Sequence, residues 1–73
     1  MRSRNKSGLL EETIMTVNGA PYVNFRSTPS TDADNIISVL IEGNQVRAVS
    51  EIGEFTACYW GSKYGYVMTK YLK

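Results

Sequence analysis

Aromatic and polar side chains at alternating positions are the first feature of this 73-residue chain that suggests chemistry. Tyr22, Asn24 and Arg26 are spaced two residues apart, so on a strand all three point to one side. A ring, an amide and a guanidinium together suit the binding of a peptide or a sugar in a shallow groove. The full set of candidate ligand-binding residues is Tyr22, Asn24, Arg26, Ser27, Phe55, Tyr59, Tyr64 and Tyr66.

Most of these residues also have an alternative, structural interpretation. Arg26 could clamp a peptide carboxylate with its planar guanidinium, but it could equally stack on a tyrosine or hold a turn by pairing with a neighbouring acid. Asn24 and Ser27 could donate to a peptide backbone, yet both residue types also stabilise turns through side-chain-to-backbone hydrogen bonds. Tyr66 and Tyr71 could serve packing, whereas Tyr22 and Tyr59 are the tyrosines that we expect to touch a ligand.

The composition argues against catalysis and metal binding. Histidine is absent and Cys58 is the only cysteine, so an intrachain disulfide, a Cys/His zinc site and the usual catalytic triads cannot be assembled. Nothing in the sequence offers Cys58 the nearby cation that would activate a thiolate, so we expect it in the core. Asp32, Asp34 and Glu42 lack the spacing of a calcium loop. The sequence therefore predicts a protein that is not an enzyme and needs no metal or cofactor.

The charge is unevenly distributed along the chain. The net charge is +1, but Arg2, Arg4 and Lys6 lie in the first seven residues, and the remainder carries five basic against seven acidic side chains. This slightly acidic body argues against a nucleic-acid partner. No apolar stretch approaches the ~20 residues of a membrane span, and the N-terminus lacks the apolar core of a signal peptide. We therefore expect neither nucleic-acid binding nor membrane insertion.

Short runs of β-branched and aromatic residues predict an all-β domain over residues 11–73, preceded by a flexible basic tail over residues 1–10. The predicted strands cover residues 13–17, 22–26, 36–41, 45–50, 55–60 and 63–67. Turn-forming residues separate them, with a long surface loop over residues 27–35 and a hairpin turn at Gly61 and Ser62. Closure into a barrel of five to seven short strands is favoured, because it hides strand edges in a small chain.

The hydrophobic pattern predicts which strand faces are buried. Val23 and Phe25 should point into the core, opposite Tyr22 and its neighbours, and Val46 and Ala48 should also face inward. The run over residues 36–41 is apolar at every position except Ser38, which indicates a strand buried on much of both faces.

Two segments resemble motifs of a known family. Asn-Phe-Arg-Ser-Thr-Pro-Ser at residues 24–30 and Gly-Tyr-Val-Met-Thr-Lys-Tyr-Leu at residues 65–72 are similar to the opening and closing motifs of the bacterial SH3 family. The resemblance covers roughly residues 13–72 and implies an SH3-like barrel. The chain departs from the family at Phe55, where a tryptophan of the binding face is frequent, so the ligand site is expected to be reshaped.

The resemblance also implies a function. Modules of this family target an attached catalytic domain or envelope protein to bacterial peptidoglycan by binding its stem peptide, cross-bridge peptide or glycan. It implies a non-catalytic monomer in the extracellular space or cell wall, as part of a secreted or phage-encoded parent protein. Two alternatives remain open at this point: an intracellular module that binds peptides such as proline-rich segments, and a self-associating assembly module.

Overall fold

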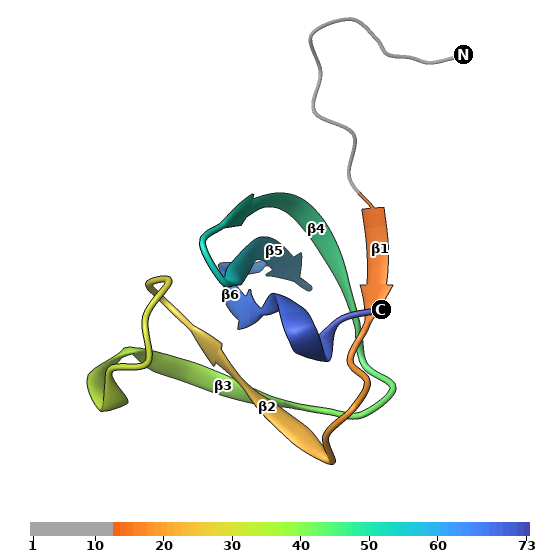
Figure 1. The fold of residues 1–73 in the computed structure, drawn as a ribbon, viewed down its shortest axis with the longest axis horizontal. Coiled ribbons are helices and arrows are strands. Elements are labelled where there is room, and N and C mark those ends of the chain that lie inside the picture. The colour runs from red at the N-terminus through yellow and green to blue at the C-terminus, as the bar shows by residue number, and fades with distance from the viewer. Residues whose placement is uncertain (1–12) are drawn as a thin grey trace, which may run out of the picture.

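The computed structural model describes residues 13–73, which form one antiparallel sheet of six strands (Figure 1). The strands are β1 (Thr13–Thr16), β2 (Tyr22–Arg26), β3 (Ile36–Ile41), β4 (Gln45–Ile52), β5 (Phe55–Trp60) and β6 (Lys63–Met68). Two 3-10 turns, η1 (Ala33–Asn35) and η2 (Thr69–Tyr71), are the helical elements of this part of the chain. Neither is long or apolar enough to cross a membrane. The all-β prediction is confirmed, while the predicted tail at residues 1–10 lies outside the described residues.

The strand order is β1-β4-β5-β6-β2-β3, with every neighbouring pair antiparallel. Hairpins join β2 to β3, β4 to β5 and β5 to β6, whereas β2 meets β6 through the single pairing of Arg26 with Tyr66. Within residues 13–73 no pairing connects β1 to β3, so the closed barrel expected from the sequence is not confirmed. The predicted strand bounds agree closely, although β4 continues to Ile52, two residues farther than expected.

The core lies between the curved halves of the sheet. Its buried apolar side chains come from five strands and from the segment after β1, and they are Val17, Val23, Phe25, Leu40, Val46, Cys58 and Val67. Phe25 and Trp60 meet edge to face, with their ring centroids 6.2 Å apart. The predicted inward orientation of Val23, Phe25, Val46 and Ala48 is confirmed, since each of these side chains is buried.

β5 is the strand that is buried on both faces. Phe55, Thr56, Ala57 and Cys58 are consecutive residues, and all four are buried. The strand lies inside the sheet, between β4 and β6. The sequence did not indicate this, because Thr56 interrupts the apolar run.

The prediction that residues 36–41 are buried on much of both faces is wrong. β3 covers these residues, but Ile36, Ile37, Val39 and Ile41 are 40–59% exposed, and only Leu40 is buried. The reason is the place of β3 in the sheet: its only strand neighbour is β2, and the β2–β3 hairpin extends away from the other strands (Figure 1). An apolar run indicates a strand, but it does not say whether neighbouring elements cover it.

Candidate functional site

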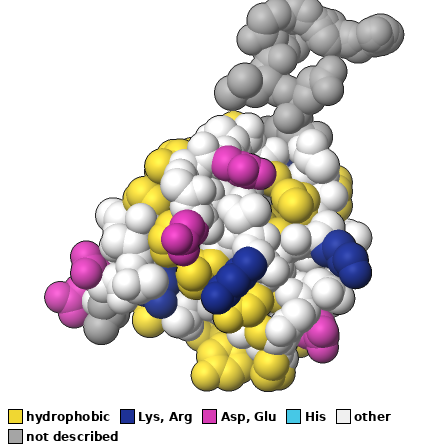
Figure 2. All heavy atoms as spheres, in the orientation of Figure 1, with side chains coloured by type: hydrophobic (Ala, Val, Ile, Leu, Met, Phe, Trp, Pro, Cys, Tyr) yellow, Lys and Arg dark blue, Asp and Glu magenta, His cyan; other side chains and the backbone are white. Residues whose placement is uncertain are grey.

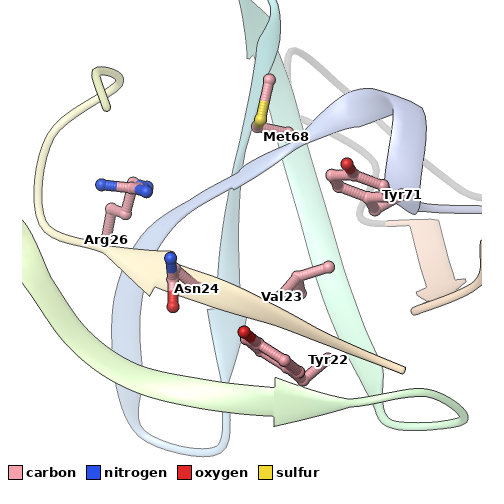
Figure 3. A pocket seen from close by; sticks show the side chains of 6 residues that line it. All are labelled: Tyr22, Val23, Asn24, Arg26, Met68 and Tyr71. Carbon is pink, nitrogen blue, oxygen red and sulfur yellow. The ribbon is translucent and has the colours of Figure 1, made fainter. Parts of the chain in front are cut away.

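A surface hollow lies between β2 and the segment that follows β6. Its volume is about 270 Å³. One wall consists of side chains from β2, and the other of Met68 and Tyr71 (Figure 3). The residues that line it are Tyr22, Val23, Asn24, Arg26, Met68 and Tyr71. The sequence-predicted trio of Tyr22, Asn24 and Arg26 is therefore brought together at one cavity.

The hollow exists because β2 and β6 diverge. After the single pairing of Arg26 with Tyr66, β2 continues toward Tyr22 without a further strand pairing to β6 or to another described strand on this side. On the opposite side, β6 ends at Met68 and is followed by the 3-10 turn η2, which carries Tyr71. Tyr71 is held in η2 by partial burial against the core, and the ammonium of Lys70 lies 5.2 Å from the centroid of its ring.

Arg26 connects the hollow to the loop over residues 27–35. Its Nη1 donates to the backbone oxygen of Asp32 and to Oδ1 of Asn35, both at 2.9 Å. Arg26 therefore holds the adjacent loop, but through a backbone oxygen and an amide oxygen and not through the pairing with an acid that was considered from the sequence. A guanidinium has five N–H donors, and the three on Nε and Nη2 make no hydrogen bond to a described residue. These three donors remain for an acceptor in the hollow.

Three tyrosines form a cluster on β5 and β6, which we call the tyrosine cluster: Tyr59, Tyr64 and Tyr66. The ring centroids of Tyr59 and Tyr64 are 4.8 Å apart, and those of Tyr64 and Tyr66 are 5.8 Å apart. The guanidinium of Arg47 lies 5.2 Å from the centroid of Tyr59. The pKa of Tyr64 is raised, first by desolvation and then by the neighbouring phenol of Tyr66.

The hollow and the tyrosine cluster adjoin at Arg26. Arg26 and Tyr66 are cross-strand partners, so their side chains project from the same face of the sheet. Tyr64 lies two residues before Tyr66 on β6 and therefore on the same face, and its cross-strand partner Tyr59 lies on β5, one strand farther away. The candidate site is therefore an open surface that runs from Tyr22 through Arg26 to the tyrosine cluster. Rings separated by hydrogen-bonding groups can bind an extended, polar ligand without cleaving it.

Two of the eight candidate residues lie elsewhere. Phe55 is only 7% exposed and packs within the sheet, so its ring does not present a surface to a ligand. Ser27 is exposed but begins the loop, where its N–H donates to the backbone oxygen of Asn35. Conversely, Met68 and Tyr71 line the hollow and were not among the candidates. Tyr71 stood in the closing motif, but its position across from β2 depends on the turn η2.

Cys58 belongs to the core, as the sequence predicted. Burial raises the pKa of its thiol from the ordinary value of 9.0 to about 11. A raised pKa means that the folded state prefers the neutral thiol, and this disfavours a nucleophilic role. Among residues 13–73 no group of three or more His, Cys, Asp or Glu side chains is placed to hold a metal ion.

The buried thiol should make folding stability depend on alkaline pH. Because unfolded chains ionise Cys58 near pH 9 and folded ones near pH 11, its contribution is present below pH 9 and is lost as the pH rises toward 11. The expected loss is roughly 1–3 kcal/mol. Urea denaturation at pH 8, 9, 10 and 11 measures it, with Cys58→Ala as the matched control. An equally steep decline in the Cys58→Ala variant would contradict the assignment.

Comparisons with protein-family models, with curated proteins and with solved structures found no match for the chain.

Proposed function

We propose that this chain is a non-catalytic binding module, with an SH3-like barrel as its architecture, and that its ligand is a peptide of the bacterial cell wall. The observation that carries the proposal is the hollow lined by Tyr22, Asn24 and Arg26, which adjoins the tyrosine cluster. Peptidoglycan stem peptides are short, extended and rich in amide and carboxylate groups. The resemblance of residues 24–30 and 65–72 to bacterial SH3 motifs supports the same ligand.

Three side chains of the β2 wall have distinct roles in this proposal. The ring of Tyr22 is 59% exposed, so it can cover a peptide residue without a rearrangement of the core. The remaining donors of Arg26 would bind a carboxylate, and Asn24 would hydrogen bond to a peptide amide. Through such contacts, the module would raise the local concentration of an attached hydrolase at the wall. The parent protein would accordingly act outside the cell.

We expect Tyr22→Ala to weaken retention on purified peptidoglycan sacculi at least tenfold. The substitution removes an exposed ring that contributes stacking and apolar contact to the ligand, but little to the core. Binding isotherms on sacculi, with the unbound fraction measured by fluorescence, give the affinity of each variant. Muropeptides added in solution should compete with the sacculi if the stem peptide is the ligand.

Ile14→Ala serves as the control, because Ile14 is 55% exposed on β1, which is not part of the candidate site. This variant should bind as tightly as the unchanged chain. Absence of retention on any wall type, or equal losses in the Tyr22 and Ile14 variants, would overturn the proposal. Binding of a proline-rich peptide in place of muropeptides would favour the intracellular alternative.

A further inference from the structure

The outer edge of β3 is an unpaired sheet edge that the site described above does not use. β3 is the last strand of the sheet and has β2 as its only neighbour within residues 13–73. Natural sheets usually protect such edges with proline, with lysine, with very short strands or with a covering segment. β3 has six residues and contains neither proline nor a charged residue. Its edge is therefore open to pairing with another strand.

The other edge of the sheet is protected, and this contrast marks β3 as different. β1 is only four residues long. The C-terminal residue Lys73 exchanges two backbone hydrogen bonds with Thr16, both of 2.9 Å, on the side of β1 that faces away from β4. The bridge between Val17 and Leu72 extends this cover. No described segment covers β3 in the same way.

The backbone of β3 presents hydrogen-bonding groups along this edge. Glu42 donates its N–H to the backbone oxygen of Pro21. Because every second residue of an antiparallel strand directs its backbone N–H and C=O to the same neighbour, those of Leu40 also face β2. The N–H and C=O of Val39 consequently face away from β2. At Ile41 the outward groups are already satisfied by Asn44, whose Oδ1 and N–H lie 3.0 Å from the N–H and oxygen of Ile41. The open stretch therefore ends before Ile41.

The exposed side chains beside this edge are apolar. Val39 and Ile41 are 48% and 59% exposed, and Tyr22, the cross-strand partner of Ile41, is also 59% exposed. Ile36 and Ile37 continue the row at the β-bulge near Arg26. Figure 2 shows hydrophobic side chains gathered at the lower margin of the molecule, where Figure 1 places the β2–β3 hairpin. A partner strand would need apolar side chains on one of its faces to cover this row.

Acidic residues lie at both ends of β3. Asp32 and Asp34 precede the strand and Glu42 follows it, and none of these carboxylates forms an ion pair with a described residue. The six residues of β3 span roughly 20 Å. A second copy of this chain would place acid beside acid at both ends, whether the two strands ran parallel or antiparallel. A partner with basic residues on either side of an apolar strand complements the edge instead.

We propose that the open edge of β3 binds an extended peptide segment by strand addition. In the centre of this segment every second residue is apolar, and both of its ends carry basic residues. Backbone hydrogen bonds to Val39 supply the pairing, the exposed row of β3 receives the apolar side chains, and the flanking carboxylates select the basic ends. This surface borders the hollow at Tyr22 but differs from it in its backbone groups and in the charge of the ligand that it selects.

The test uses the ¹⁵N-labelled chain and a synthetic peptide, Lys-Lys-Val-Thr-Val-Thr-Val-Thr-Lys-Lys, followed by amide shifts and by hydrogen exchange. We expect shifts concentrated at residues 36–41 and at least tenfold slower exchange of the Val39 amide in the complex. A peptide with glutamate in place of lysine should bind at least tenfold more weakly. N-methylation of either the valine or the threonine amides provides matched controls, because only alternate amides of an added strand face β3.

One methylated set should abolish binding and the other should leave it within threefold. Shifts absent from β3, equal binding of the two charge variants or equal effects of the two methylated sets would each overturn the proposal. A dimer formed through β3 at micromolar concentration, detected by light scattering with the same β3 shifts in the absence of peptide, would also overturn it in favour of a second copy.

Discussion

The Gly65→Ala variant is expected to lose at least about 3 kcal/mol of folding free energy, enough to leave a large part of the molecules unfolded at 25 °C. A Cβ at Gly65 would lie 2.5 Å from the backbone oxygen of Arg26 and 2.8 Å from Cζ of Phe25. The oxygen belongs to the point where β2 meets β6, and Phe25 is fully buried in the core. Neither atom can move away without breaking the strand contact or opening the core.

This loss of stability comes from the close approach of Arg26 and Phe25 to the added Cβ and not from the backbone conformation of Gly65. A second glycine, with an open Cβ position, therefore supplies the control. Gly61 has a φ of +62° but has no atom within 4 Å of its Cβ position. Gly61→Ala should therefore lose only about 1 kcal/mol. Chemical denaturation followed by circular dichroism measures both variants. A Gly65→Ala variant whose stability lies within 1 kcal/mol of the unchanged chain would show that β2 and β6 are not in contact at this point.

The strands could be predicted from local pattern alone. Val23 and Phe25 alternate with polar neighbours, and glycine or asparagine marks the turns, so strand positions follow from residue types a few positions apart. Exposure is different, because it depends on which strand ends up at an edge of the sheet. Ile37 and Val39 lie on an edge strand and are exposed, whereas Thr56 lies on an interior strand and is buried. That order results from pairings between residues distant in sequence.

In the candidate site, too, the features within one strand could be predicted from the sequence, whereas those that depend on distant segments could not. Tyr22, Asn24 and Arg26 belong to one strand, and the alternation of side chains along a strand was enough to place them on one side. The opposite wall could not be derived in this way, since Met68 and Tyr71 belong to β6 and η2, which are far from β2 in sequence. The sequence indicated the importance of Arg26 but left its role open, because the group that fixes the guanidinium, Asn35, is nine residues away.

Asn35 is the residue whose loss should most disturb the loop beside the candidate site. Its side chain is 7% exposed, and its two Nδ2 hydrogens are shared among four acceptors of the loop. These acceptors are the backbone and side-chain oxygens of Thr28 and Ser30, at 2.8–3.2 Å. Oδ1 accepts from Arg26, so one amide links the loop to β2. Asn35→Ala is expected to lose about 2–4 kcal/mol, since it leaves several buried or half-buried groups without partners.

Asn35→Asp separates the two functions of this amide. The carboxylate has the same shape and still accepts from Arg26, now as a charged pair, but it presents an oxygen to the backbone oxygens of Thr28 and Ser30, which can only accept. If the Nδ2 donors hold the loop, Asn35→Asp should be nearly as unstable as Asn35→Ala, with faster exchange of the Ser27 amide, which donates to the backbone oxygen of residue 35. An aspartate variant as stable as the unchanged chain would show instead that the bond to Arg26 alone fixes the loop. In that case the contacts of Nδ2 would follow from the loop's conformation and would not determine it.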